Sequence, residues 1–306
     1  MPTDIALPAG ITVLERGWLS ANNIVLLGEQ AAVVDSGYAT HAPQTVALIE
    51  AALGGRPLDQ LLNTHLHSDH CGGNAALQAR YPGVKTWVPP GHAALVQNWD
   101  PVGLSYTPTG QQCPRFKLDG VLQPGTEVQL GALTWQIHAA PGHDTHSVVL
   151  FQPEHRILIS ADALWERGFG VVFPELEGEQ AFAEVGATLD LIERLAPHTV
   201  IPGHGRVFSD VGTSLAYARH RLDGFVRDPQ KHVIHAGKVL LKFKLLELQR
   251  IPLEQLLDWA CQTTHMAAMH SSHFSSLKLR DWITQLANSL VAVKAATLED
   301  GEIVNT

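Results

Sequence analysis

The 306-residue chain has few cysteines, no long apolar run and no excess of basic residues. Its three cysteines, Cys71, Cys113 and Cys261, are odd in number and widely spaced, which argues against a disulfide framework and favours a reducing cytoplasm. No apolar run approaches the ~18 residues of a membrane span. The first ten residues do not join a basic segment to an apolar one, so we expect no signal peptide. The formal net charge of -9 disfavours nucleic acid as a partner, although a local basic patch would still allow it.

Short apolar strand patterns alternate with helical patterns over the first two thirds of the sequence, which is typical of an α/β fold. The segment 97–120 is rich in Pro and Gly and has no periodicity, so we predict a long surface loop that can act as a lid. After about residue 211 the strand patterns fade and helical patterns follow. We therefore predict a catalytic domain over residues 1–210 and a smaller, mainly helical domain over residues 211–306.

The segment THLHSDHCGGN (64–74) places three histidines and an aspartate within six consecutive positions. The pattern of residues 58–67 predicts a buried strand that ends at the histidines, so His65 and His67 point to the same side, because side chains alternate along a strand. Asp69 and His70 then lie where the chain turns. Imidazole and carboxylate groups in this arrangement are good ligands for zinc-like cations.

Three further ligand-type residues follow predicted strands elsewhere in the chain. His143 and His204 each lie in a Pro-Gly-His turn, and Asp162 ends the apolar run ILISAD. A lone histidine or aspartate at a strand end is usually structural. Three of them in order, after a dense histidine cluster, favour a shared metal site. By contrast, His265, His270 and His273 lack an accompanying carboxylate or cysteine, so we predict no second metal site there.

These motifs resemble the metallo-β-lactamase superfamily, in particular the catalytic domains of glyoxalase II and lactonases. HLHSDH fits the His-x-His-x-Asp-His signature at every position, and VVDSG (33–37) resembles the family's early Asp-turn motif. The resemblance covers roughly residues 10–210. It implies a four-layer αβ/βα sandwich with metals at one edge, and gives Asp35 a structural role near the site. It assigns seven ligands: His65, His67 and His143 to one metal, Asp69, His70 and His204 to a second, and Asp162 to both.

Two divalent ions per chain are the implied cofactors, with zinc as the default and iron or manganese as alternatives. Two such ions lower the pKa of a shared water, and the bridging hydroxide attacks a carbonyl or phosphoryl centre. The predicted catalytic residues are Asp69 and Asp162, which orient the nucleophile. The predicted substrate pocket comprises Trp18, His146, Trp165, Phe169 and Phe173.

The leading hypothesis is a cytoplasmic hydrolase of a small ester-like substrate: a thioester, a lactone or a related acyl compound. The main alternative is a nuclease or phosphodiesterase acting on single-stranded RNA. A winged-helix-like C-terminal domain would then supply a phosphate track from Arg219, Arg221, Lys242 and Lys244. A mononuclear iron persulfide dioxygenase is a third hypothesis, disfavoured by the complete ligand set. The sequence leaves a homo-oligomer open.

Overall fold

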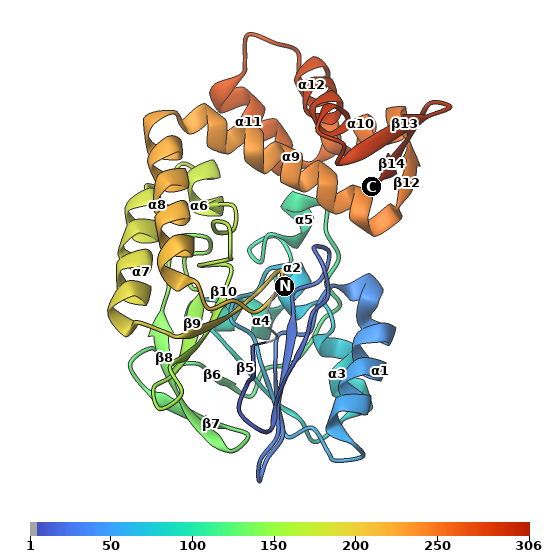
Figure 1. Cartoon of the computed structure of the whole chain (residues 1–306). Helices are drawn as coiled ribbons and strands as arrows, with labels where there is room; N and C mark the ends of the chain where they lie inside the picture. The colour runs from blue at the N-terminus through green and yellow to red at the C-terminus, as the bar shows by residue number, and fades with distance from the viewer. Residues whose placement is uncertain (1–4) are drawn as a thin grey trace.

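Residues 5–306 of the computed structural model form two stacked β-sheets with helices on their outer faces and a helical segment across one end (Figure 1). Within these residues the first sheet has the strand order β1-β2-β3-β4-β5-β6 and the second the order β11-β10-β9-β8-β7. The strands of the two sheets are β1 (Ile11–Leu14), β2 (Asn23–Leu26), β3 (Ala32–Val34), β4 (Gln60–Leu62), β5 (Lys85–Val88), β6 (Gly120–Val121), β7 (Glu127–Leu130), β8 (Leu133–Ala139), β9 (Val148–Gln152), β10 (Ile157–Ala161) and β11 (Thr199–Pro202). The helices up to β11 are η1 (Ala39–His41), α1 (Ala42–Leu53), α2 (Ser68–Cys71), α3 (Asn74–Arg80), η2 (Pro90–His92), α4 (Ala93–Asn98), α5 (Tyr106–Thr109), α6 (Phe173–Leu176) and α7 (Phe182–Leu195).

Apolar side chains on both faces of the strands explain why each sheet packs against the other sheet on its inner face and against helices on its outer face. In β2, Ile24 and Leu26 belong to the core between the sheets, whereas Val25 packs with α1 and α3 on the outside. In β10, Ile159 faces the inner core and Leu158 packs with α7 and α8 (Val211–Arg227). The layers run helix, sheet, sheet, helix, so the predicted four-layer α/β sandwich is confirmed.

The predicted strand over residues 58–67 is wrong at its carboxyl end. Strand β4 ends at Leu62. Asn63 still donates its backbone N–H to the Trp87 carbonyl of β5, whereas the backbone N–H of Thr64 donates to the Asp35 carboxylate instead of to a neighbouring strand. His65 therefore lies in a loop, and His67 is the N-cap of α2. The alternation argument for these two histidines fails, although their rings still lie 4.7 Å apart.

The C-terminal segment is mainly helical, as predicted, and it also contains a small sheet that we did not predict. Its elements after α8 are α9 (Pro229–Leu248), β12 (Arg250–Pro252), α10 (Leu253–Gln262), α11 (Thr264–His273), α12 (Leu279–Ala292), β13 (Ala296–Glu299) and β14 (Glu302–Asn305). The strands pair in the order β12-β14-β13, and the winged-helix-like character of this domain stays a prediction. Helix α8 packs on α7 and the second sheet, whereas α9 begins a separate apolar core. The domain boundary near residue 211 stays a prediction, and residues 1–4 of the first predicted domain lie outside the described part of the chain.

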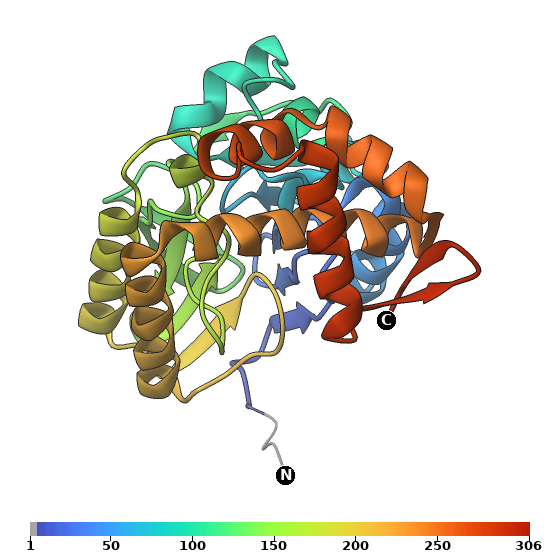
Figure 2. The same ribbon diagram turned by 90° about the horizontal axis from the view of Figure 1, so that it is seen from above.

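Helix α9 runs across the end of the sandwich when the molecule is seen from above (Figure 2). Among residues 5–306, no helix combines the length and the apolar character needed to cross a membrane.

Candidate metal centre

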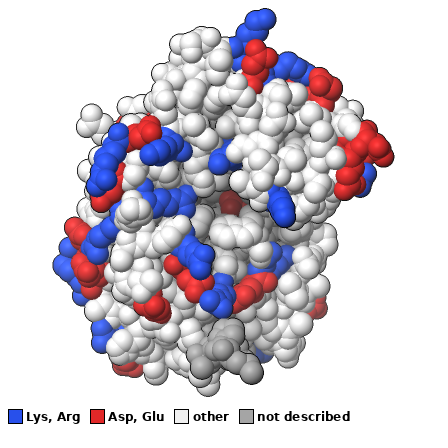
Figure 3. All heavy atoms as spheres, turned by 45° about the horizontal axis from the view of Figure 1, so that its top comes forward, with Lys and Arg blue, Asp and Glu red and all other residues white. Residues whose placement is uncertain are grey.

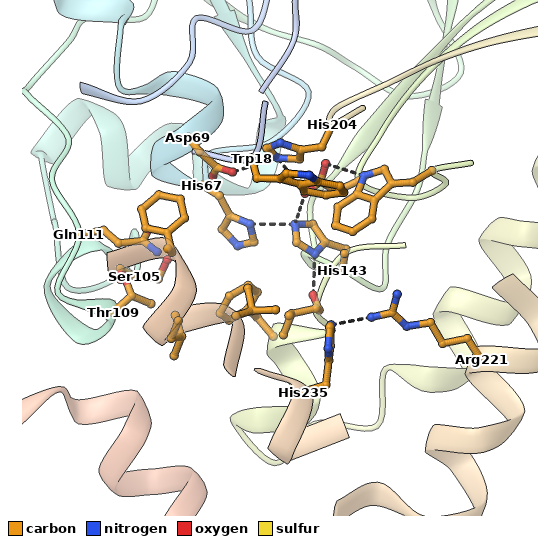
Figure 4. A pocket seen from close by; sticks show the side chains of 18 of the residues that line it. Trp18, His67, Asp69, Ser105, Thr109, Gln111, His143, His204, Arg221 and His235 are labelled. Atoms are coloured by element: carbon orange, nitrogen blue, oxygen red, sulfur yellow. Dashed lines mark hydrogen bonds and ion pairs between the residues drawn. The ribbon is translucent and has the colours of Figure 1, made fainter. Parts of the chain in front are cut away.

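The seven predicted ligands converge at the end of the sandwich that faces α9. Figure 4 shows four of them, His67, Asp69, His143 and His204, around the pocket that they line. The loop after β4 and helix α2 bring His65, His67, Asp69 and His70. The turn between β8 and β9 brings His143. Asp162 directly follows β10, and His204 follows the parallel neighbour β11. Carboxyl ends of adjacent parallel strands meet at one edge of a sheet, which is why Asp162 and His204 come together.

Three histidine nitrogens form one cluster. His67 Nδ1 lies 2.9 Å from His143 Nε2, and His143 Nε2 lies 3.2 Å from His65 Nε2. A second cluster joins Asp69, His70 and His204: Asp69 Oδ2 is 3.1 Å from His204 Nε2 and 3.9 Å from His70 Nε2. Both clusters are compact enough for a single cation each.

Asp162 lies between the two clusters. Its Oδ1 is 3.5 Å from His70 Nε2, and its Oδ2 is 3.4 Å from His143 Nε2 and 3.8 Å from His204 Nε2. The indole N–H of Trp165 donates to Oδ1 at 3.1 Å and fixes the orientation of the carboxylate. One carboxylate thus faces nitrogens of both clusters.

Hydrogen bonds on the far side of three imidazole rings orient the nitrogens that face inward. Nδ1–H of His70 donates to Asp35 Oδ2 (2.8 Å), that of His143 to the Val171 carbonyl (2.5 Å), and that of His204 to the Gly17 carbonyl (3.1 Å). Each Nε2 then presents a lone pair to the centre, as metal-binding histidines do.

The inward nitrogen of His70 carries a specific sign of a missing partner. His70 is fully buried, and among residues 5–306 its Nε2 has no hydrogen-bond partner. A buried polar atom without a partner is costly, and a cation would satisfy this one. The donor set of imidazoles and carboxylates fits a divalent ion.

Burial and neighbouring charges set the protonation of these groups. Burial, with nearby histidines, lowers the pKa of His67 to about 4 and holds the pKa of His65 well below its usual range. Burial acts to raise the pKa of Asp162, but the adjacent His204 and His70 outweigh it and lower that pKa. Burial acts to lower the pKa of His70 and of His204, but nearby carboxylates outweigh it and raise both pKa values. Neutral imidazoles and an ionised carboxylate are the forms that bind cations, so His65, His67 and Asp162 already have the binding form, whereas His70 and His204 would release a proton on binding.

A cavity of about 370 Å³ opens onto both clusters. Of the predicted pocket residues, Trp18, Trp165 and Phe173 line it. Phe169 is 1% exposed and packs in the core behind the wall, with the Arg221 guanidinium over its ring. His146 lies behind the site, where its ring meets His92 edge to face. Neither of these two side chains lines this cavity, because a sequence position beside the motif does not fix the direction of a side chain.

Other cavity residues were missed. Ser105, Thr109 and Gln111 line it from the segment 97–120, so only the prediction of a lid-like loop pointed toward them. Arg221 of α8 donates to His235 of α9 within the wall (Figure 4). Nothing in the local sequence distinguishes this pair from surface residues, because their burial results from the packing of the two helices.

The chain is similar to several curated hydroxyacylglutathione hydrolases. It is 34% identical to that of Anaeromyxobacter dehalogenans over 142 residues, covering 46% of this chain and 45% of the relative. It is 31% identical to that of Acidiphilium cryptum over 215 residues, covering 69% of this chain and 74% of the relative. The chain spans about half the length of four of the curated relatives it matches, those of Anaeromyxobacter dehalogenans, Brucella anthropi, Dechloromonas aromatica and Stenotrophomonas maltophilia.

Solved structures share the whole fold at low sequence identity. A β-lactamase domain protein from Burkholderia ambifaria is 22% identical, with a TM-score of 0.58 over 99% of this chain and 97% of its own. A metallo-β-lactamase family protein from Thermus thermophilus is 16% identical, with a TM-score of 0.57 over 98% of this chain and 100% of its own. The model of the metallo-β-lactamase superfamily matches residues 16–204, which include all seven clustered side chains, and the chain belongs to this superfamily.

Proposed function

We propose that the chain is a hydrolase that uses two divalent metal ions to cleave small ester-like substrates, thioesters foremost. The observation that carries the proposal is the pair of ligand clusters joined by Asp162, with the unpartnered Nε2 of His70 in the second cluster. The similarity to enzymes named hydroxyacylglutathione hydrolase, which act on a thioester, supports the substrate class.

The distances support a division of the ligands into two sets. His65, His67 and His143 would hold one ion and Asp69, His70 and His204 the other, with Asp162 contacting both. We propose zinc as the native metal, although iron and manganese accept the same ligands.

Two divalent ions lower the pKa of water and polarise the substrate carbonyl. The chain's own groups position the reactants. Asp69 lines the cavity, where its carboxylate accepts a hydrogen bond from the attacking water and orients it. Trp165 holds the carboxylate of Asp162 through its indole N–H. The rings of Trp18 and Phe173 exclude bulk water from the cavity wall.

A small substrate is favoured over RNA because the predicted phosphate track is not assembled. Arg219 pairs with Asp190 and Glu193 of α7. Lys242 donates to backbone carbonyls at the C-terminus, and Lys244 pairs with Glu247. Arg221 is partly buried against His235. With these groups engaged inside the chain, we propose a small-molecule substrate. A cytoplasmic location is supported by the three free thiols among residues 5–306.

The test is metal analysis followed by a substrate panel. Protein reloaded with zinc should hold two ions and hydrolyse a hydroxyacylglutathione thioester or a simple acyl thioester. Lactones, phosphodiesters and RNA complete the panel, each measured across a salt series. Salt-sensitive RNA cleavage without any acyl hydrolysis would reject the proposal, because counterion release makes phosphate binding depend steeply on salt.

A further inference from the structure

A second hollow adjoins the metal-lined cavity and has no role in the chemistry described so far. It measures about 350 Å³ and shares Trp18, His235, Val239 and Phe243 with that cavity. One face of α9 between His235 and Leu246 forms its floor, and Leu290 and Val293 at the end of α12 form its far side. We call this hollow the α9 trough. Figure 3 looks toward the opening between the C-terminal helices and the sandwich, with acidic atoms visible in its depth and basic atoms around its rim.

The walls of the α9 trough are apolar and partly exposed to water. Val239, Phe243 and Leu246 recur at three- and four-residue spacing, which places them on one face of the helix. Val293 is 66% exposed and Trp18 is 55% exposed, so large apolar surfaces meet solvent at both ends of the trough. Exposed apolar surface that is contiguous rather than scattered marks a binding site.

The charged groups of the trough leave most of its wall apolar. Its described lining includes no carboxylate, and its two lysines are Lys238 and Lys242, both partly buried. The ammonium group of Lys242 bonds to the Ala295 carbonyl, Asn305 Oδ1 and the Thr306 carbonyl, so its methylene stem is the part that lines the trough. An apolar chain fits the hydrocarbon part of these walls, where a polar group out of reach of Lys238 would lose hydrogen bonds to water without replacement.

We propose that the α9 trough binds the apolar acyl chain of the substrate, so that this hydrolase prefers medium- to long-chain acyl thioesters. The inference rests on the proposed function, because it requires the scissile carbonyl to lie at the ligand clusters. From there the chain passes between Trp18 and Phe243, which line both hollows. The leaving group of a glutathione-type thioester is polar and charged, so the acyl side is the part that matches an apolar trough.

The length of the trough sets the expected chain length. Val239 to Leu246 spans seven residues, or about 10 Å along the helix axis. At about 1.2 Å per extended bond, this distance holds roughly eight carbons. Each methylene that leaves water should raise kcat/KM about fourfold until the trough is full.

The first experiment uses a series of acyl thioesters with one common leaving group, from acetyl to tetradecanoyl. We expect kcat/KM to rise steeply from butyryl to decanoyl and then to level off. If the protein hydrolyses the short thioesters but kcat/KM does not rise with chain length above butyryl, the trough does not bind the acyl chain, and the proposed function still stands. If the protein with two metals cleaves no member, the proposed function fails, and the binding experiment below decides the trough by itself.

The second experiment places a charge in the trough. Val293→Glu introduces a carboxylate at the far side, and Leu298→Glu is the matched control on β13, where Leu298 is 52% exposed and lies outside the trough. In the wild type, calorimetry should show decanoate binding at least ~10-fold more tightly than butyrate, as several buried methylenes require. We expect Val293→Glu to abolish this preference and Leu298→Glu to keep it, both with wild-type melting temperatures. Equal binding of the two acids by the wild type, or an unchanged preference in Val293→Glu, would overturn the assignment.

Discussion

Replacing Asp35 by asparagine tests how the position of His70 is maintained. Asp35 Oδ2 accepts Nδ1–H of His70 and the Thr64 hydroxyl, each at 2.8 Å, and Oδ1 accepts the Thr64 backbone N–H at 2.9 Å. The residue has φ +59°, a conformation that asparagine also adopts readily. The substitution therefore removes charge and acceptor capacity without straining the backbone.

The amide cannot replace both carboxylate oxygens. If its oxygen accepts the Thr64 N–H, its NH₂ group faces Nδ1–H of His70, and two donors oppose each other. The ring then has to carry its hydrogen on Nε2, the nitrogen that faces Asp69 and Asp162. Loss of this buried bond costs about 1–3 kcal/mol. We expect the affinity for the metal ion held by His70 to fall by about 10- to 100-fold, the usual effect of removing such a partner.

Competition with a chromophoric chelator measures both binding steps. We expect one ion to bind as in the wild type and the other more weakly. Asp59→Asn is the matched control, because Asp59 accepts the Ala31 N–H and an amide oxygen can do the same. Wild-type affinity for both ions in Asp35→Asn would refute the idea that this carboxylate sets the protonation of His70.

Three further substitutions test the bridge, the buried histidines and the C-terminal core. Asp162→Ala removes the carboxylate between the clusters, so turnover should fall at least ~100-fold and the metal content should drop below two per chain; wild-type turnover would show that Asp162 is only a strand-end residue. Burial, with the Arg221 charge, lowers the pKa of His232 to about 4, below the 6.5 of an unperturbed histidine. Between these two values the unfolded chain binds more protons than the folded chain. The free energy of unfolding should therefore decrease as the pH is lowered from 6.5 towards 4, by up to about 3 kcal/mol at pH 4. His232→Gln keeps an acceptor for the Val172 N–H. It should reduce the difference in unfolding free energy between about pH 7 and about pH 5, measured in urea. The control is His220→Gln at an exposed histidine, and a wild-type pH difference in His232→Gln would contradict the prediction. Trp282 is 2% exposed in the core of α9, α10 and α12, so Trp282→Ala should cost about 3–5 kcal/mol in chemical unfolding, and a loss below 1 kcal/mol would show that the core collapses around the gap.

The convergence of the seven candidate ligands was predictable because four of them lie within six residues and the others follow strong strand patterns. The route to that prediction was partly wrong. Strand β4 ends at Leu62, and a side-chain acceptor, Asp35, takes over the backbone of Thr64. The Thr64 N–H donates to a side chain almost thirty positions away instead of to a neighbouring strand, and local propensity does not contain that information.

The small C-terminal sheet was missed although its turn has a recognisable sequence. Asp300 and Gly301 join β13 to β14, with φ +49° and +82°. Asp-Gly between two short strands is a strong hairpin signal, since both central residues of such a turn need positive φ. The signal was outweighed by the long helical patterns around it. Unlike the Asp-Gly turn, the walls of the cavity and the trough have no local sequence signal, because they form only once α9 has packed across the sandwich.

The proposed function and the proposed trough together assign the chemistry and the choice of substrate to different parts of the chain. The sandwich supplies all seven clustered ligand side chains, whereas α9 and α12 supply the trough wall from Val239 to Val293. A substitution in the trough should therefore change the preference for chain length without changing metal content. Asp35→Asn should do the reverse, lowering metal affinity while the ratio of decanoyl to butyryl turnover, measured at saturating zinc, stays at the wild-type value. If Val293→Glu released metal, or if Asp35→Asn changed chain preference, the two parts of the site would be coupled, and the trough could not be treated as an independent binding surface.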